Sequence, residues 1–305
     1  MRKKSKVLMR EVLRHKELYL MFIPIAAFYI IFCYVPMYGV TLAFKEYNIK
    51  LGILGSEWIG FDHFVELFRT VKFAEVFKNT LIISLLKILF CFPAPILVAL
   101  LFNEMRTKRL KNVLQTFMYL PHFISWVVMA KLVQDILSID GVINDFIALC
   151  GGERVSFTLE PDAFYGILIS SEILKEVGWG TIIYTAALAG VPAELYEAAD
   201  VDGCSRIKKI IHITLPCIGM TIMINFILTL GNIMNAGFDP IFNLYNQAVY
   251  STADIIDTYV YRIGLTSGEF EQATAVGLFK SVINFILLLG SNFVVKKISG
   301  VGIYE

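Results

Sequence analysis

The sequence predicts an all-α polytopic membrane protein with six transmembrane helices. Of its 305 residues, 57% are hydrophobic and 17% are charged, and the mean hydropathy is +0.67. A typical soluble domain carries about 25% charged residues, so this composition excludes an ordinary soluble globule. It also excludes an intrinsically disordered chain, which is polar and charged. Apolar runs of roughly 20 residues, the length that crosses a bilayer, recur between polar clusters.

The first predicted span follows a basic N-terminal stretch and has no A-x-A-like cleavage site behind it, so it is expected to remain as a helix. The second contains Pro93 and Pro95, which predict a kink that neighbouring helices must accommodate. The third and fourth are long enough to tilt or to extend past the lipid. The six spans are expected at Leu18–Tyr38, Thr80–Phe102, Val113–Leu137, Phe164–Ala189, Pro216–Asn235 and Ala273–Val295.

The distribution of Lys and Arg residues predicts how the chain is oriented in the membrane. Seven lie in the basic tail 1–17, four between the second and third spans, three between the fourth and fifth, and two after the sixth. The other side has seven in all. The excess places both termini and the loop 190–215 in the cytoplasm, with a transmembrane domain at 18–297 and a short cytoplasmic tail at 298–305. The segments 44–79, 138–162 and 236–272 would then be external, and they are apolar enough to form short helices on the outer face.

The loop between the fourth and fifth spans has the features of a docking surface. Glu197-Ala198-Ala199 favours a helix start with an acid near its positive end, and the small alanines allow a partner surface to approach. Gly203 permits a sharp turn with positive φ. The Leu215-Pro216 step opens the next span, where the missing N–H of proline costs nothing. The loop is therefore predicted to form a helix–turn–helix with an exposed small-residue corner.

This loop resembles the signature of binding-protein-dependent ABC importer permeases. The resemblance implies a type I importer permease fold, with one N-terminal helix and a five-helix core at about 73–297. It also implies that 190–215 docks on an ATP-binding subunit, where Glu197 pairs with a basic residue and Gly203 holds the turn. Asp200 lies within the same segment. The matching positions are Glu197, Ala198, Ala199, Gly203, Ile213, Leu215 and Pro216.

Five further segments are similar to the polysaccharide-type branch of sugar permeases, which is related to the first permease subunit of maltose and glycerol-phosphate importers. They are Tyr119–Val128, Val177–Tyr184, Gly237–Asn246, Asp257–Leu265 and Ala273–Val282. This resemblance implies an oligosaccharide cargo, a bacterial plasma-membrane location, a second homologous permease, two ATPase subunits and an external lipid-anchored sugar-binding protein. Alternating access would be the mechanism.

Several absences agree with a transport subunit that is not itself an enzyme. The sequence has no G-x-x-x-x-G-K-[ST] phosphate loop, so ATP and Mg are expected on partner ATPases and no cofactor on this chain. The four histidines are scattered and the five cysteines form no C-x-x-C pair, so no metal site is predicted. The expected contacts are with membrane lipids and proteins rather than with nucleic acid.

A sugar path needs aromatic faces for stacking and amides for hydrogen bonds. The candidates are Trp126, Trp179, Tyr184, Asn232 and Asn235, although each could instead serve helix packing. Ionisable groups within the spans either line such a path or pair with one another. They are Lys87, Lys131, Asp135, Glu172, Lys175, Glu176 and Lys280.

The sequence supports two other functions less well. A secondary transporter needs coupling-ion acids at mid-membrane and usually an internal repeat. Here Glu176 is the only acid near a span centre, Lys175 lies beside it, and no convincing repeat is present. An intramembrane enzyme would need a base beside a serine such as Ser125 or Ser170, and the sequence places none in an obvious dyad.

Overall fold

The computed structural model describes residues 14–299, and within them almost every element is a helix. The exception is a short antiparallel ladder between strands β1 (Lys45–Glu46) and β2 (Glu57–Trp58), with Lys45 opposite Trp58. Two short helices, α3 (Gly52–Gly55) and α4 (Asp62–Arg69), lie beside this ladder in the chain. The prediction of a helical protein is confirmed, with this small strand pair as an addition.

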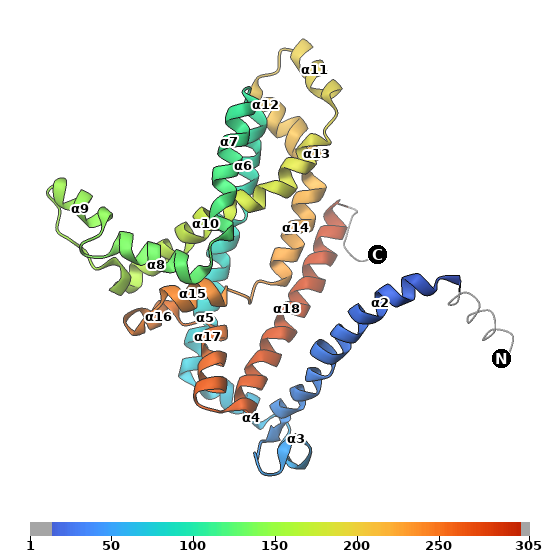
Figure 1. Ribbon diagram of the computed structural model, residues 1–305, viewed down its shortest axis with the longest axis vertical. Coiled ribbons are helices and arrows are strands. Elements are labelled where there is room, and N and C mark those ends of the chain that lie inside the picture. Colours follow the sequence, from blue (N-terminus) through green and yellow to red (C-terminus); the bar gives the residue numbers. More distant parts are fainter. Residues whose placement is uncertain (1–13, 300–305) are drawn as a thin grey trace.

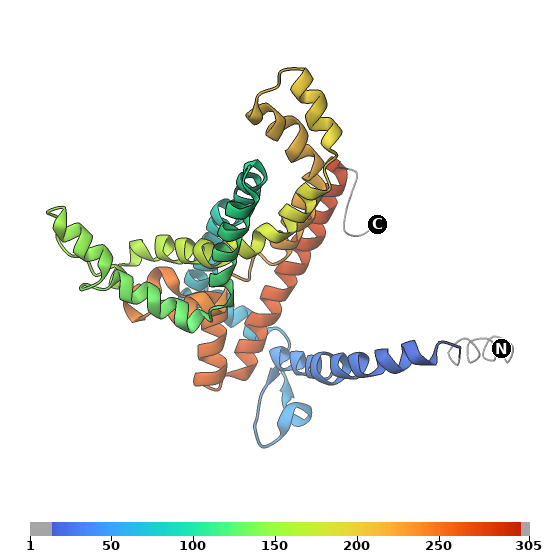
Figure 2. The same cartoon turned by 45° about the horizontal axis from the view of Figure 1, so that its top comes forward.

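The N-terminal helix stands apart from the rest of the molecule (Figures 1 and 2). It consists of α2 (Lys16–Tyr29), η1 (Ile30–Tyr34) and η2 (Pro36–Phe44), and its most apolar window is entirely unburied. Only its end, η2, packs against the last long helix, α18 (Phe270–Ser299). An apolar helix without protein neighbours on most faces is suited to lipid or to another membrane subunit.

The second predicted span is part of one long helix made of α5 (Val71–Leu86), η3 (Lys87–Cys91) and α6 (Pro93–Glu104). Near the place of the predicted proline kink, the helix has a wide, π-helical turn just before Pro93. In this turn the Phe92 amide donates a hydrogen bond to the Lys87 carbonyl at 3.0 Å. Pro93 has no N–H to offer the carbonyl four residues earlier, which explains why the regular pattern changes there.

The third predicted span, Val113–Leu137, is wrong as a single helix. The chain forms α7 (Lys108–Tyr119) and η4 (Leu120–Phe123), becomes extended at Ile124 and Ser125, and starts again as α8 (Trp126–Leu137). The Ser125 hydroxyl accepts a hydrogen bond from the Val128 amide at 3.4 Å and so caps the new helix. The α7 helix packs against α10, whereas in Figure 1 α8 leads away toward α9 (Val142–Leu149).

The fourth predicted span agrees with α10 (Pro161–Ala189), which follows η5 (Phe157–Leu159) and packs against α6. The fifth, Pro216–Asn235, needs correction. The helix begins earlier, as α12 (Arg206–Lys209), η6 (Ile210–Thr214) and α13 (Leu215–Cys217), then bends by 64° into α14 (Gly219–Gly231) and ends before Asn235. Preceding it is α11 (Ala193–Val201).

The segment from 236 to 272 contains α15 (Phe238–Leu244), η7 (Gln247–Val249), α16 (Tyr250–Ala253), α17 (Ile256–Tyr261) and η8 (Arg262–Thr266). The short helices expected in the three longer connecting segments are therefore present. In the described chain, three helices are long and apolar enough to cross a membrane, and the bent pair would make a fourth. The α10 helix is long enough, but Glu172, Lys175 and Glu176 lie in its middle.

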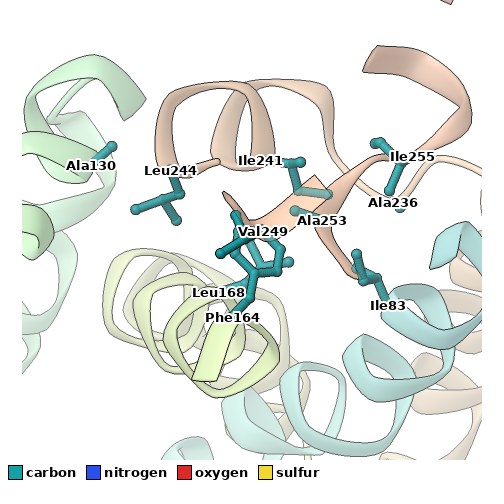
Figure 3. Packing of buried hydrophobic residues seen from close by; sticks show 10 residues of the cluster. All are labelled: Ile83, Ala130, Phe164, Leu168, Ala236, Ile241, Leu244, Val249, Ala253 and Ile255. Atoms are coloured by element: carbon teal, nitrogen blue, oxygen red, sulfur yellow. The ribbon is translucent and has the colours of Figure 1, made fainter. Parts of the chain in front are cut away.

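One hydrophobic cluster joins helices from distant parts of the sequence (Figure 3). Side chains of α5, α8 and α10 meet those of α15, η7 and α16 around residues that are almost fully buried. They are Ile83, Ala130, Phe164, Leu168, Ala236, Ile241, Leu244, Val249, Ala253 and Ile255. Burying this apolar surface holds the connecting segment 236–272 against the long helices.

A buried carboxylate fixes the same segment by polar contacts. Asp254 is fully buried, and its Oδ2 lies 2.6 Å from Arg262 Nη2 and 3.3 Å from Lys72 Nζ. Thr258 donates to its Oδ1 at 2.8 Å, and Asn79 Nδ2 donates to the Asp254 carbonyl at 3.1 Å. Burial by itself lowers the pKa of Arg262, but the hydrogen bonds and charge of Asp254 outweigh it and raise that pKa.

Candidate functional site

The predicted helix–turn–helix is present at residues 193–217 and is called the α11–α13 hairpin below. It lies at one end of the molecule, beyond the ends of α6 and α14 (Figure 1). Its turn is at Gly203, whose φ of +69° is a conformation that a residue with a Cβ rarely adopts. Glu197 and Ala198 are exposed, whereas Ala199 is buried against the hairpin itself. The expectation that both alanines are exposed is therefore wrong for Ala199.

Two polar contacts close the hairpin onto itself. The hydroxyls of Tyr196 and Thr214 lie 2.9 Å apart, and Lys209 forms an ion pair with Asp200. Both contacts join α11 to the helix that enters α14, so the two arms are held as one unit. Of the other motif residues, Ile213 and Leu215 are half-buried and Pro216 is exposed.

The outward face of the hairpin is unusually apolar for a polar connecting loop. Val201 is 89% exposed and Ile207 is 69% exposed. Glu197 lies on the same α11 helix and has no ion-pair partner within residues 14–299. Exposed apolar side chains around an unpaired acid are typical of a surface that a partner covers.

Two cavities with several polar side chains in largely apolar walls lie next to each other between α5–α6, α10 and α14. Their volumes are about 370 and 320 Å³, and Lys87, Asn225 and Thr229 line both. The first cavity is also lined by Asn232 and Asn235, and the second by Tyr184 and Glu172. Three of the five predicted path residues therefore border a cavity, and together they provide amide, hydroxyl and phenol groups.

The cavity residues Asn225 and Thr229 are absent from the sequence-based candidates. Asn225, Thr229 and Asn232 are spaced four and three residues apart on a helix that is otherwise apolar. That spacing places polar side chains on one helical face. A test of helical periodicity within the fifth predicted span would therefore have found this polar stripe.

Trp126 and Trp179 lie elsewhere, at the break between α7 and α8. Trp179 stacks on the ring of His122 with 4.3 Å between ring centroids, and Lys175 Nζ lies 5.6 Å from the Trp126 ring. His122 Nδ1 is 2.7 Å from Glu176 Oε2, and Lys175 donates to the His122 carbonyl at 2.7 Å. These contacts give both tryptophans a packing role at the helix junction and do not place them in either cavity.

The remaining ionisable groups of the spans are paired. Lys131 and Asp135 form the expected i,i+4 pair at 2.7 Å on the exposed surface of α8, and Lys280 pairs with Asp257. Lys87 pairs with Glu172, with 2.6 Å between Nζ and Oε2. No group of three or more histidine, cysteine or acidic residues in residues 14–299 is arranged to hold a metal ion.

Comparison with known proteins gives a consistent match over nearly the whole chain. Residues 91–300 match the family described as "Binding-protein-dependent transport system inner membrane component". The chain is 45% identical to Protein LplB of Bacillus subtilis over 292 residues, covering 95% of this chain and 92% of that protein. It is 43% identical over 304 residues to the polygalacturonan/rhamnogalacturonan transport system permease protein YteP of the same organism. That match covers 99% of this chain and 95% of YteP.

Among solved structures, one chain of a bacterial alginate ABC transporter, in complex with its alginate pentasaccharide-bound periplasmic protein, has the same fold. The TM-score is 0.90 at 42% sequence identity, and the match covers 97% of this chain and 99% of that chain. A second structure of a transporter for the acidic polysaccharide alginate gives the same TM-score at 43% identity. The shared fold extends over all the elements that form the hairpin and the two cavities.

Proposed function

The chain belongs to the family of binding-protein-dependent transport system inner membrane components, and we propose that it is the membrane-spanning permease subunit of an ATP-driven importer of oligosaccharides. Family membership and relatives named for polygalacturonan and alginate transport support the carbohydrate cargo. ATP and Mg bind to two partner ATPase subunits, so this chain performs no chemistry itself. It resides in the bacterial plasma membrane, in contact with lipid.

The observation that carries the proposal is the α11–α13 hairpin. Its two arms are joined by the Asp200–Lys209 and Tyr196–Thr214 contacts, while Glu197 and an apolar face remain available. Because the second arm of the hairpin leads directly into α14, movement of an ATPase docked on the hairpin is transmitted to that helix. We assign to Glu197 a pairing with a basic residue of the ATPase.

The cargo path follows the two cavities. Asn225, Asn232 and Asn235 offer amides that exchange hydrogen bonds with sugar hydroxyls, and Tyr184 offers an aromatic wall. The cavities lie on the α5, α10 and α14 side of the molecule, where a second, homologous permease would complete the enclosure. ATP binding by the ATPases and docking of a loaded external binding protein favour different permease states, which produces alternating access.

Six membrane crossings fit this arrangement if α7 with η4 and the long α10 each cross the bilayer. The other four are the N-terminal helix, α5–α6, the bent helix 206–231 and α18. Both termini are then cytoplasmic, as the charge distribution predicts. Residues 1–13 of the basic tail and the last residues, 300–305, lie outside the described residues.

A pull-down from native membranes tests the proposal. The tagged wild-type chain should bring a second permease and an ATPase, identified by mass spectrometry. Glu197→Lys should lose the ATPase and keep the permease. Glu194→Lys is the matched control, because Glu194 is an exposed acid of the same helix outside the motif, and it should retain both partners.

A chain that purifies alone as wild type would contradict the importer. Loss of the ATPase from both variants would contradict the specific role of Glu197. Uptake that survives removal of the ATPases and stops with a proton ionophore would instead indicate a secondary transporter.

A further inference from the structure

Lys87 lies where three distant segments meet. It begins the wide turn η3, its side chain is only 15% exposed, and its Nζ is 2.6 Å from Glu172 Oε2 on α10. On another side it touches the backbone at Gly237, where an added Cβ would come within 2.7 Å of the Lys87 Nζ. Gly237 has a φ of +97°, a conformation that favours glycine.

The Lys87–Glu172 ion pair is close but has little further support. Glu172 Oε2 is buried, and its polar contact among the described residues is the Lys87 ammonium at 2.6 Å. Within residues 14–299 the Lys87 ammonium contacts no acceptor side chain other than this carboxylate, although it carries three donors. Charged groups at membrane depth are costly, so a pair with this much unused hydrogen-bonding capacity indicates a place for a ligand.

Both cavities border this pair. Lys87 lines the 370 and 320 Å³ cavities, and Glu172 lines the second. The cavities also share Asn225 and Thr229. A solute that moves from one cavity to the other therefore passes within reach of the Lys87 ammonium.

We propose that Lys87 is a carboxylate-binding site for acidic sugars, and that Glu172 occupies it when no cargo is present. This rests on the proposed importer function and assigns the cargo to uronate-bearing oligosaccharides. A uronate carboxylate replaces the Glu172 carboxylate on Lys87, so the ammonium keeps a counter-ion throughout the exchange. A neutral sugar hydroxyl competes poorly, because it carries no negative charge and would leave the Lys87 ammonium without a counter-ion in a poorly solvated site.

The test uses the complete transporter with its binding protein in proteoliposomes, and two cargoes with the same sugar chain, one with ionised carboxylates and one with these groups esterified. They are tetragalacturonate and its methyl ester, each supplied at concentrations that saturate transport. Wild type should import the acid faster than the ester. Lys87→Gln should reduce uptake of the acid by about tenfold or more, the expected loss of one bond to a charged group, and leave uptake of the ester nearly unchanged.

Two further variants distinguish a loss of uptake caused by the missing charge from one caused by misfolding. Lys87→Arg keeps the positive charge and should retain the preference for the acid. Glu172→Gln removes the internal competitor and should lower the KM for the acid without changing that for the ester. Lys131→Gln, on the exposed surface of α8, is the control and should change the uptake of neither cargo.

Three results would overturn the inference. One is an equal loss of both cargoes in Lys87→Gln, which indicates a structural role. Another is a wild type that imports the ester as well as the acid. The third is a wild type that imports neither cargo although the ATPase and second permease still co-purify, which would refute the acidic cargo and leave the importer function intact.

Discussion

At the scale of single residues, glycine positions determine what the two candidate sites can tolerate. At Gly203 an added Cβ would meet no atom within 4 Å, so the constraint is the positive φ alone. At Gly237 the positive φ is combined with the contact to Lys87. The turn of the hairpin and the start of α15 therefore both need a residue that tolerates positive φ, and at Gly237 an added side chain would also meet Lys87.

We predict that Gly203→Val impairs uptake, because a β-branched residue in this conformation costs about 1–2 kcal/mol. Gly203→Asn should retain most uptake, since asparagine adopts positive φ more readily. Uptake is measured beside the amount of ATPase that co-purifies. Equal activity of the two variants would show that the turn does not depend on backbone conformation.

At the scale of elements, the buried carboxylate of Asp254 connects α16 and α17 to α5. We predict that Asp254→Ala destabilises the protein by about 3–5 kcal/mol, because Arg262 and Lys72 lose their shared partner in a buried site. Asp135→Ala breaks an exposed pair and should cost less than about 1 kcal/mol. Thermal unfolding in detergent compares the two, and similar losses would contradict the role of Asp254.

A second element-scale prediction concerns the packing of α7 on α10. An added Cβ at Gly178 would lie 1.9 Å from the Met118 carbonyl oxygen, and main-chain atoms cannot move aside as a side chain does. Gly178→Ala should therefore push α7 away from α10 at a cost of about 1–3 kcal/mol or more.

Gly166→Ala is the matched control in the same helix, because nothing lies within 4 Å of its added Cβ. It should be neutral or stabilise the helix by about 0.5–1 kcal/mol. Thermal unfolding in detergent again provides the measurement. A Gly178 variant as stable as the Gly166 variant would contradict the close approach of the two helices.

At the scale of the whole molecule, the proposed orientation predicts which sites are reached from outside the cell. When the other four cysteines are replaced, native Cys150, exposed after α9, should react with a membrane-impermeant maleimide in intact cells. A Lys108→Cys variant, at the start of α7 among four basic residues, should react only after permeabilisation. The reverse labelling would contradict the orientation.

The arrangement of the elements also explains which sequence-based predictions held. Long apolar runs and the Glu197–Pro216 motif are local patterns, and the described helices and the turn at Gly203 follow them. The break at Ile124–Ser125 had a local signal in Pro121 and the Ser125 cap, but a continuous apolar run concealed it. The bend after Cys217 was likewise hidden within an apolar segment.

Local sequence determines the helices, their order and the hairpin, because hydrophobic length, turn residues and charge act on neighbouring positions. It also suggested Tyr184, Asn232 and Asn235 as path residues. Only the tertiary structure decides that these border shared cavities, that Trp126 and Trp179 do not, and that Lys87 meets both Glu172 and Gly237. The reason is physical: an ion pair or a cavity wall depends on contacts between segments far apart in the chain, and the spacing of residues within one helix carries no information about which distant helix lies opposite.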